Sequence, residues 1–540
     1  MTDGDRALDR DASSLGAAGA RVATGLFNAA EYLLDRRVRA GDADRLALTG
    51  PGGDVTYGQL LDRVRRAAAA LVDLGLQPEQ RILLFMADSP EFVTVYLAAM
   101  RIGAVPVPVS SMLYADGLAE LLRDSRARLL ALSPGFVATG YQAASQAPEL
   151  RGILVPGPAA DGPVPVRDLD ELCAAATPID TVYPTVEDSP AFWLYTSGTT
   201  GTPKGAMHRH GSVRVVCETY GSQVLGIRPG DRTISAAKAF FAYGLGNSLL
   251  FPLSVGATAI LEPAPSRPDT IAARAAEYGA TLFFAGPTFF AAMLRADLKR
   301  DALAGVRLAA SAGEALPAAL YQRWTEHFGV DILDGIGMTE MLHIFLSNRE
   351  GQVRPGTTGV AVPGYDLRVV DEAGLDLPDG QPGTLLVRGA STATGYWERY
   401  DASRLVFQGE WLRTGDTYVR DAEGYYTCLG RTGDMLKAGG IWVSPAEVET
   451  CLLAHEAVAQ AVVVAAIDPD GLEKPVAFVM LNPGHEVGER ELIEFCQRRL
   501  PSFKRPRRIS FVSGYPTTAT GKVRRVELRE AAAAALEVTA

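Results

Sequence analysis

Strand and helix patterns alternate along the first part of the chain, and this order constrains the fold more than any other feature. Thr56-Tyr57-Gly58-Gln59 has the form of a helix capping box, and apolar residues follow it at helical spacing until Gly75. The apolar run 82–86 is too short for a helix and is typical of a buried strand. Ser89-Pro90 begins a second helix, and residues 104–109 form another apolar run. This β-α-β-α-β order predicts a largely parallel sheet covered by helices.

The C-terminal part of the chain has a different pattern. Ser444-Pro445-Ala446-Glu447 forms a second capping box, with proline in the first helical turn. The residues after it predict strands at 458–467, 476–481 and 509–512 and a helix at 490–500, which together make a small α+β unit. The segment 430–434 before it is rich in glycine and charge and is the best candidate for a linker.

The predicted fold class is α/β, with a large N-terminal α/β body of layered sheets and helices and a small mobile α+β C-terminal lid. At roughly 150 residues per domain, the 540 residues predict three or four packed units. We expect residues 1–20, rich in Ala, Gly, Ser and Asp, to be a disordered leader. Residues 21–431 should form the body and residues 432–540 the lid.

Composition excludes several classes of protein. The 52 basic and 63 acidic residues give a net charge of −11, so binding of nucleic acid through bulk charge is not expected. The five cysteines are far apart and lack zinc-binding spacing, which indicates a reducing, cytoplasmic setting. The uncharged stretch 240–261 contains Asn247, Pro252 and three glycines, so it predicts a buried core segment and not a membrane span.

The most informative stretch is the loop Tyr195-Thr196-Ser197-Gly198-Thr199-Thr200-Gly201-Thr202-Pro203-Lys204-Gly205, which follows a predicted buried strand. Glycines let backbone N–H groups face an anion, hydroxyls add donors and Lys204 adds a positive charge, so the loop predicts phosphate binding. A flexible surface loop is the usual meaning of such composition, but the preceding strand and the terminal Lys-Gly make it a poor explanation here. The Walker pattern is excluded, because Pro203 precedes the lysine and Gly205 replaces the hydroxyl that binds magnesium.

This loop resembles the signature of the acyl-adenylate-forming superfamily, which includes acyl- and aryl-CoA ligases, nonribosomal adenylation domains and beetle luciferases. The resemblance extends over nearly the whole chain after residue 25. Four further motifs match in order: Gly337-Met338-Thr339-Glu340, Trp411-Leu412-Arg413-Thr414-Gly415-Asp416, Gly430-Arg431 with Lys437-Ala438-Gly439-Gly440, and Pro516-Thr517-Thr518-Ala519-Thr520-Gly521-Lys522. Finer details resemble the benzoate-CoA ligase subgroup: residues 240–247, 334–337 and 340–348.

The resemblance implies an ATP site. It assigns the β- and γ-phosphates to the loop residues Thr196, Ser197, Gly198, Thr199, Thr200, Gly201 and Lys204. It assigns Mg²⁺ to Glu340, phosphate contact to Thr339, and the ribose hydroxyls to Asp416 with help from Arg431. Adenine would lie against Gly313, Glu314, Ala315, Asp334, Gly335, Ile336 and Gly337, with Ile336 standing where the wider family usually has tyrosine.

The resemblance also implies a lid that changes orientation between two half-reactions. Lys522 would reach the carboxylate and the α-phosphate during adenylation, and Lys437 would face the site only after the lid rotates. Gly439 and Gly440 would then lie beside the channel for the CoA thiol. Gly433 and Asp434 would form the hinge; many relatives have a charged residue where this chain has Gly433, so a side-chain role there is lost.

A substrate pocket is expected from Phe240, Ala242, Tyr243, Gly244, Ala310, Gly335, His343 and Ile344. Aromatic and small residues together suit a flat ring. Core packing is an alternative role for each of the apolar residues. Amino-acid adenylation domains hold the substrate ammonium with an aspartate near residues 241–242, and this chain has none there, which disfavours an α-amino acid. We hypothesise that His343 favours a benzoate with an ortho amino or hydroxyl group.

The leading prediction is therefore an ATP-dependent aryl-CoA ligase of the benzoate type, with ATP, Mg²⁺ and coenzyme A as cofactors or co-substrates and an aromatic acid as substrate. The alternative is a stand-alone adenylation enzyme that loads an aryl group onto a separate carrier protein. No carrier-type phosphopantetheine motif follows Lys522, which favours CoA. A luciferase-like oxygenase and a non-enzymatic nucleotide-binding module remain as weaker alternatives. Neither nucleic acid nor membrane is expected as a partner, and the oligomeric state stays open, a homodimer included.

Overall fold

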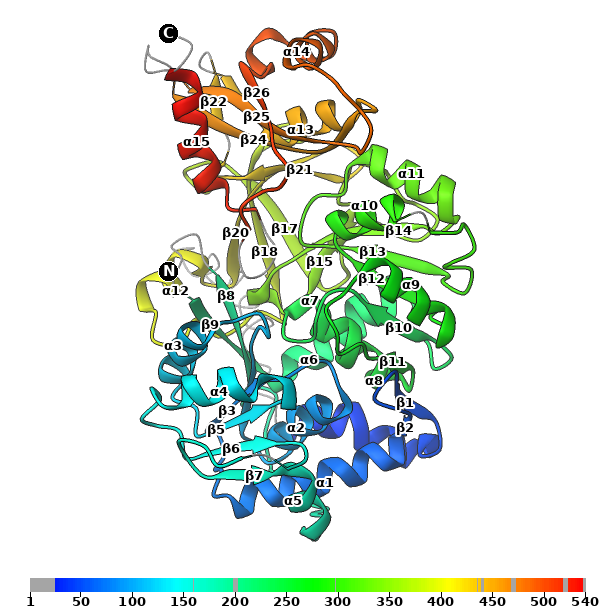
Figure 1. Cartoon of the computed structure of the whole chain (residues 1–540), viewed down its shortest axis with the longest axis vertical. Coiled ribbons are helices and arrows are strands. Elements are labelled where there is room, and N and C mark those ends of the chain that lie inside the picture. The colour runs from blue at the N-terminus through cyan, green and yellow to red at the C-terminus, as the bar shows by residue number, and fades with distance from the viewer. Residues whose placement is uncertain are drawn as a thin grey trace, which may run out of the picture.

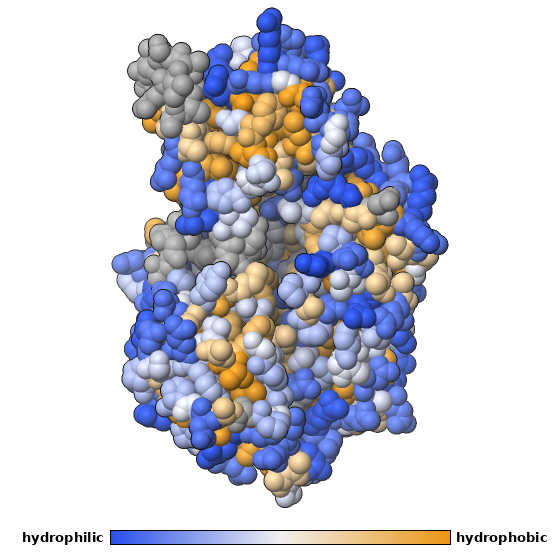
Figure 2. Space-filling view, in the orientation of Figure 1, coloured by the Kyte–Doolittle hydropathy of each residue, from blue (hydrophilic) through white to orange (hydrophobic). Residues whose placement is uncertain are grey.

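The computed structural model describes residues 25–158, 160–197, 203–296, 298–434, 436–438, 441–467, 473–517 and 523–537. A large body occupies the lower and middle parts of Figure 1, and the C-terminal strands and helices form a smaller unit above it. The space-filling view shows the same division as a narrow upper lobe on a broader body (Figure 2). The large body and small lid predicted from the sequence are therefore confirmed, whereas the predicted leader lies outside the described residues.

The lower part of the body is a five-stranded parallel sheet in the order β4-β3-β5-β6-β7. Its strands are β3 (Arg81–Phe85), β4 (Val105–Pro108), β5 (Leu129–Leu132), β6 (Gly152–Val155) and β7 (Val166–Asp168). Its helices are α1 (Tyr57–Asp73), α2 (Pro90–Arg101), α3 (Ala115–Ser125), α4 (Val137–Ala144) and α5 (Leu169–Ala175). The predicted β-α-β-α-β order is confirmed, including the complete capping box of Thr56 and Gln59 and the N-cap Ser89.

A nine-stranded mixed sheet forms the middle of the body, in the order β16-β15-β14-β13-β12-β10-β11-β1-β2. Its strands are β1 (Leu46–Thr49), β2 (Val55–Thr56), β10 (Arg232–Ser235), β11 (Thr258–Ile260), β12 (Leu282–Ala285), β13 (Leu308–Ser311), β14 (Ile332–Gly337), β15 (Ile344–Ser347) and β16 (Val360–Ala361). One face packs on α9 (Pro268–Glu277), α10 (Pro287–Arg295) and α11 (Ala318–Phe328). The other packs on α6 (His210–Val216), α7 (Ala242–Leu245), α8 (Phe251–Val255) and two π-helical segments, Cys217–Val224 and Gly246–Leu250.

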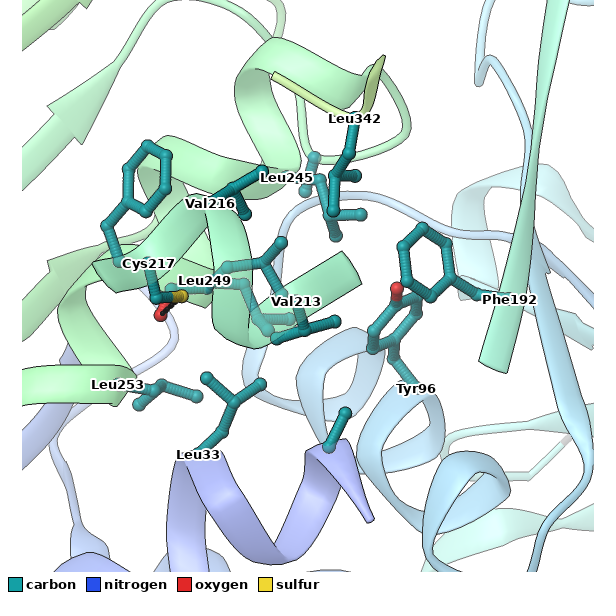
Figure 3. Close-up of a cluster of buried hydrophobic side chains, with 14 of the residues drawn as sticks. Leu33, Tyr96, Phe192, Val213, Val216, Cys217, Leu245, Leu249, Leu253 and Leu342 are labelled. Atoms are coloured by element: carbon teal, nitrogen blue, oxygen red, sulfur yellow. Dashed lines mark hydrogen bonds between the residues drawn. The ribbon is translucent and has the colours of Figure 1, made fainter. Parts of the chain in front are cut away.

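Helical residues 242–255 run through the main hydrophobic core and do not form a membrane span. Phe251 and Leu253 are fully buried, as the sequence predicted for this uncharged stretch. Leu245, Leu249 and Leu253 meet side chains from α2, α6 and β8 (Pro190–Ser197) in Figure 3. Within the described part of the chain, no helix combines the length and the apolar character that crossing a bilayer requires.

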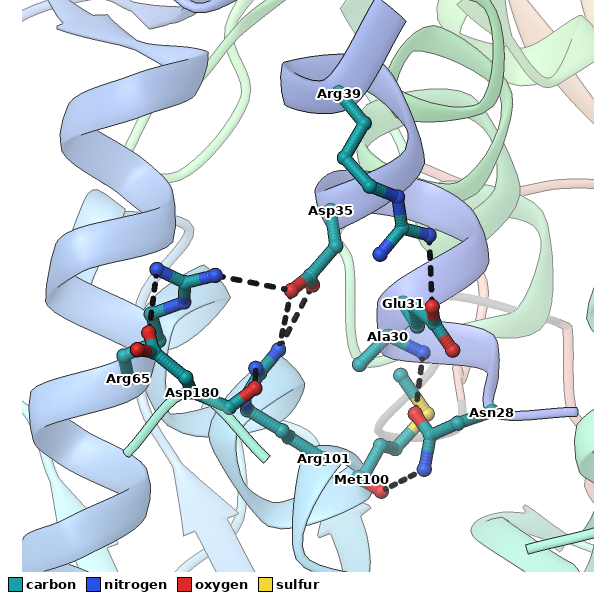
Figure 4. Close-up of polar contacts among 9 residues, drawn as sticks. All are labelled: Asn28, Ala30, Glu31, Asp35, Arg39, Arg65, Met100, Arg101 and Asp180. Carbon is teal, nitrogen blue, oxygen red and sulfur yellow. Dashed lines mark hydrogen bonds and ion pairs between the residues drawn. The ribbon is translucent and has the colours of Figure 1, made fainter. Parts of the chain in front are cut away.

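A buried ion pair ties the N-terminal segment to the parallel sheet. Arg101 at the end of α2 has no exposed side-chain surface, and one terminal nitrogen contacts both carboxylate oxygens of Asp35 at 2.8–2.9 Å. Its other terminal nitrogen donates to the backbone oxygen of Asp180 at 2.6 Å, and Arg65 bridges the Asp35 and Asp180 carboxylates (Figure 4). Because a buried charge without a partner is costly, this network holds the N-terminal segment around Asp35 against α2.

Two smaller sheets complete the body. The antiparallel sheet above the middle of the body contains β17 (Tyr365–Val370), β18 (Gly383–Gly389), β19 (Phe407–Gln408), β20 (Trp411–Arg420) and β21 (Tyr426–Arg431), with α12 (Tyr400–Val406) beside β19. The other sheet is the hairpin of β8 and β9 (Pro203–Arg209). The strand predicted before the phosphate loop is confirmed, since residues 191–194 are buried in β8.

The lid has its own core. Its elements are β22 (Leu436–Ala438), β23 (Ile441–Val443), α13 (Pro445–Leu453), β24 (Val458–Ile467), β25 (Glu473–Leu481), α14 (Glu489–Gln497), β26 (Arg508–Phe511) and α15 (Arg525–Glu537). The four predicted lid elements are confirmed to within three residues at either end. Ser444 caps α13 as predicted, whereas the Glu447 carboxylate accepts hydrogen bonds from Lys504 at 2.6 and 2.7 Å.

Candidate active site

The carboxyl end of β14 carries the centre of the site. Parallel strands β12, β13 and β14 end at the same edge of the sheet, which is where α/β folds bind ligands. Asp334 lies in the last part of β14, and Thr339 and Glu340 follow it in the 3₁₀ turn Thr339–Met341. Thr339 is half-buried and Glu340 is buried. The predicted ATP motif is therefore one continuous strand-and-turn unit.

The hairpin of β8 and β9 meets this turn from the other side. Thr196 pairs with Lys204 near the loop end of the hairpin, and both are half-buried. The ring nitrogen Nε2 of His208 in β9 donates to the backbone oxygen of Thr339 at 2.8 Å. Burial lowers the pKa of His208 to about 4, so this ring is neutral and acts as a fixed structural donor. Gly198, Thr199, Thr200 and Gly201 lie outside the described residues, as does the side chain of Ser197.

Asp416 and Arg431 face each other across β20 and β21. The Arg431 Nε atom lies 3.1 Å from the Asp416 carboxylate, and Nη1 of Arg431 donates to the backbone oxygen of Thr414. Asp416 is buried, whereas half of the Arg431 side chain is exposed. Asp334 and Asp416 both raise the pKa of Cys428, after the larger effect of burial, to about 11. The two carboxyl groups are therefore close enough to act on the same thiol.

Asp334 is an unusual acid. It is buried, and one carboxyl oxygen accepts a long hydrogen bond of 3.4 Å from the Leu316 backbone. The Ser311 side chain and the Gly335 backbone also act on this carboxyl group. Burial raises the pKa of Asp334 to about 8, so the group is mostly protonated at neutral pH. Gly313, Glu314 and Ala315, which follow β13, are exposed, so a ligand can reach them.

Most of the residues predicted to bind the aromatic acid lie close together. The Tyr243 hydroxyl donates to the backbone oxygen of Ala310 at 2.7 Å, and the rings of Tyr243 and His343 lie 5.5 Å apart. A Cβ atom on Gly335 would come within 2.9 Å of the Ile344 side chain. A Cβ atom on Gly244 would meet the Lys238 backbone oxygen at 2.0 Å, so only glycine fits there. Ala242 is half-buried beside Tyr243, whereas the ring contact of Phe240 is with Phe241, at 4.4 Å.

His343 is buried between three rings, those of Tyr220, Tyr243 and Phe251. Burial lowers its pKa to about 3, so the ring is neutral. Its Nε2 atom lies 3.3 Å from the backbone oxygen of Tyr243 and carries the proton, which leaves Nδ1 as an acceptor. No described residue donates to Nδ1.

The hinge and lid residues are described in part. The Gly433 backbone oxygen accepts from Arg529 at 3.1 Å, and the Asp434 carboxylate pairs with Arg525 and Arg529 of α15. The space around Gly433 is open and its φ is not positive, so this lid orientation does not require glycine there. Lys437 pairs through its backbone with Trp442 in the β22–β23 hairpin. Gly439, Gly440 and Lys522 lie outside the described residues.

Comparison with known proteins agrees with this geometry. The family model for AMP-binding enzymes matches residues 34–397, and the model for the AMP-binding enzyme C-terminal domain matches residues 447–522. The chain belongs to the AMP-binding enzyme family.

Individual relatives of this AMP-binding enzyme cover almost its full length. The benzoate–CoA ligase of Thauera aromatica is 43% identical over 511 residues, which are 94% of this chain and 96% of that protein. A crystal structure of a benzoate CoA ligase from Burkholderia xenovorans LB400 matches with a TM-score of 0.86 and 44% identity, covering 93% of this chain and 100% of that one. The anthranilate CoA ligase AuaEII in complex with anthranoyl-AMP matches with a TM-score of 0.89 and 38% identity, covering 94% and 98%.

The sequence did not reveal every residue that shapes the site of this AMP-binding enzyme. The Asp88 carboxylate accepts from the Ala239 backbone at 3.1 Å, and the Lys238 ammonium donates to the backbone oxygens of Glu262 and Ala264. These contacts hold the chain directly before Phe240. The Tyr396 hydroxyl donates to the Glu340 carboxylate. Such residues carry no local signal, because each acts on a segment far away in the sequence.

A cavity of about 400 Å³ lies away from this site, between helices α10 and α11 of the body and the lid. The body contributes three arginines, Glu326, His327 and two apolar residues to its lining, and the lid contributes Ala459 and Asn482; none of the predicted site residues that the structure describes lines it.

Proposed function

We propose that the chain is an ATP-dependent aryl-CoA ligase that activates benzoate or a substituted benzoate. The acid would first form an acyl-AMP with release of pyrophosphate, and the acyl group would then pass to CoA with release of AMP. The observation that carries the proposal is the position of the Tyr243–His343–Ile344 wall. It lies beside the Asp334–Glu340 segment. The chain is 43% identical over 511 residues to a benzoate–CoA ligase.

The chemistry explains why the site needs positive groups. A carboxylate is a poor electrophile, and attack of its oxygen on the α-phosphorus converts it to an acyl-AMP with AMP as a good leaving group. Bringing an anion to a triphosphate requires cations that offset their repulsion. We assign Lys204 and the 196–204 loop to the β- and γ-phosphates, Asp416 to the ribose hydroxyls, and residues 313–315 and 334–337 to adenine. Protonated Asp334 supports this arrangement because it adds no negative charge near the nucleotide.

Glu340 is the proposed magnesium ligand. Mg²⁺ is commonly held by one or two carboxylates together with substrate phosphates and water. Among the described residues, no group of three or more acidic, histidine or cysteine side chains could hold a metal alone, so a site shared with ATP fits the donor set. Magnesium bound there would neutralise phosphate charge during attack. The residues of the chain would orient the partners: Glu340 through its carboxylate and Thr339 through its hydroxyl.

The lid assignments rest on the sequence motifs and on the contacts around the hinge. Arg431 pairs with Asp416 of the body, whereas Asp434 pairs with α15 of the lid. These contacts support a boundary between residues 431 and 432, with the body at 21–431 and the lid at 432–540. We propose that Lys522 acts in adenylation and that Lys437, Gly439 and Gly440 act in thioester formation after the lid turns about Gly433 and Asp434.

His343 is proposed to select substituents at the ortho position of the ring. Its Nδ1 atom is an acceptor without a described donor, and an ortho amino or hydroxyl group could supply one. The variant H343A should lose the difference between benzoate and its 2-amino and 2-hydroxy analogues in kcat/KM. If the variant kept the parent's ratios, the assignment would be wrong.

The decisive experiment measures both half-reactions with a panel of benzoates. We expect pyrophosphate release from ATP only when an aromatic acid is present, and AMP with an aryl thioester only when CoA is added. The variant K522A should lose the first step while still binding ATP. Acyl-AMP formation without thioester formation from free CoA would refute the ligase and indicate an enzyme that loads a carrier protein.

A further inference from the structure

Tyr396 lies between the two charged groups assigned to magnesium and phosphate. It is 7% exposed, and its hydroxyl donates to the Oε1 atom of Glu340 at 2.5 Å. The Lys204 ammonium lies 5.7 Å from the centre of the same ring, within range of a cation–π contact. One side chain therefore touches the carboxylate through its hydroxyl and the ammonium through its ring.

Backbone hydrogen bonds fix the segment that carries Tyr396 to both neighbours. The N–H of Ala393 donates to the backbone oxygen of Glu340 at 2.8 Å. The N–H of Trp397 donates to the backbone oxygen of Gly205 at 2.9 Å, one residue after Lys204. The position of the ring is therefore set by the turn of Glu340 and by β9 together, and side-chain rotation alone does not determine it.

This placement matters because the Glu340 carboxylate and the Lys204 ammonium carry opposite charges. The Tyr396 hydroxyl donates a hydrogen bond to one Glu340 carboxylate oxygen, and the ring of the same side chain faces the Lys204 ammonium. Within the described residues, this hydroxyl is the only hydrogen-bond partner of the Glu340 carboxylate, and the Lys204 ammonium lies over the Tyr396 ring and not in an ion pair with Glu340. A direct pair would satisfy both charges with each other and leave less attraction for a metal and a phosphate.

We propose that Tyr396 is a positioning residue that keeps Lys204 and Glu340 apart and leaves each free for its own part of Mg·ATP. The hydroxyl holds one carboxylate oxygen and leaves the second for the metal. The ring holds the ammonium on its face and away from the Glu340 carboxylate. This inference rests on the proposed function, because it takes Glu340 as the magnesium ligand and Lys204 as a phosphate contact.

The test compares ATP binding with magnesium and without it, measured by calorimetry in magnesium buffer and in EDTA. The variant Y396F keeps the ring and loses the hydroxyl, so it should lose about tenfold of the enhancement that magnesium gives to ATP affinity. Its affinity for metal-free ATP should stay within about twofold of the parent's. Loss of a charge-assisted hydrogen bond is expected to have an effect of this size. Y365F is the matched control, because Tyr365 is also buried and its hydroxyl bonds Ser391 at 2.8 Å.

The outcomes separate this inference from the function on which it rests. Y396F that retained the full magnesium enhancement, or lost affinity equally in magnesium and in EDTA, would overturn the positioning role. E340Q should lose the magnesium enhancement entirely. If E340Q kept it, the assignment of the metal to Glu340 would fail, and the role of Tyr396 with it. Loss in E340Q with retention in Y396F would overturn the Tyr396 inference alone.

Discussion

The proton on Asp334 should make the stability of the enzyme fall as pH rises. Burial raises the pKa of this carboxyl from 3.8 to about 8, so the folded state holds a proton that the unfolded chain releases. A raised folded pKa contributes stability that is fully present below the unfolded pKa of 3.8 and is lost as pH rises through 8. Between these values, each pH unit costs about 1.4 kcal/mol.

The variant D334N removes this titration. Between pH 6 and pH 8, we expect the free energy of unfolding of the parent to fall by about 2 kcal/mol relative to that of D334N. The asparagine can keep the acceptor for the Leu316 backbone but places a buried NH₂ group where the carboxyl oxygen was, which is expected to cost stability. That penalty does not change with pH, so the comparison rests on the change between two pH values and not on absolute stability.

Urea unfolding followed by tryptophan fluorescence gives the measurement, since Trp324 is fully buried in the helical layer packed on this face of the sheet. D88N is the matched control. Burial raises the pKa of Asp88 only to about 6, so most of its effect is complete below the tested window. It should change the pH dependence by less than about 0.5 kcal/mol. Parallel pH dependences of the parent and D334N would refute a protonated Asp334.

Three further perturbations test the framework of the site. R101M leaves the Asp35 carboxylate buried without its main partner and should lower the free energy of unfolding by about 3–5 kcal/mol in urea titrations; a loss below 1 kcal/mol would contradict this. D416N should weaken ATP binding by about tenfold in calorimetry, and it should bind ATP and 2′-deoxy-ATP equally, whereas the parent prefers ATP. Leu342 is fully buried with a φ of 67°, so L342G should be at least as stable as L342A, the reverse of the usual order; a clearly more stable L342A would show that this backbone is not strained.

Local signals explain why the secondary structure could be predicted. The capping box at Thr56, the N-cap Ser89 and the bounds of β24 depend on residues within one or two turns, and the structure confirms them. The order of the nine-stranded sheet has no such signal. Its strand β1 pairs with β11, more than two hundred residues later, and antiparallel β15 joins at β14. Long-range pairings of this kind depend on packing of whole layers and not on local sequence.

The residues of the proposed site fall into the same two groups, those with a local sequence signal and those without one. The motifs that contain Thr339, Glu340 and Asp416 could be recognised because each is a short contiguous stretch. Tyr396 and Asp88 could not, because their effect depends on which distant segment they touch: the turn at Glu340 and the chain at Ala239. The sequence also could not show that Asp334 retains a proton, since that follows from burial alone.

The turn after β14 connects the two sides of the proposed site, the one for the nucleotide and the one for the aromatic acid. Glu340, on the nucleotide side, and His343, on the aromatic side, are three residues apart and are separated by Leu342, whose buried side chain lies in the core of Figure 3. Leu342 adopts a φ of 67° and a ψ of −44°, a conformation that costs about 1–3 kcal/mol and persists only when its surroundings enforce it. Because the core holds this residue in place, the turn presents Glu340 and His343 at a fixed spacing. The core packing of Leu342 therefore sets the distance between the proposed magnesium ligand Glu340 and the proposed ring-binding residue His343.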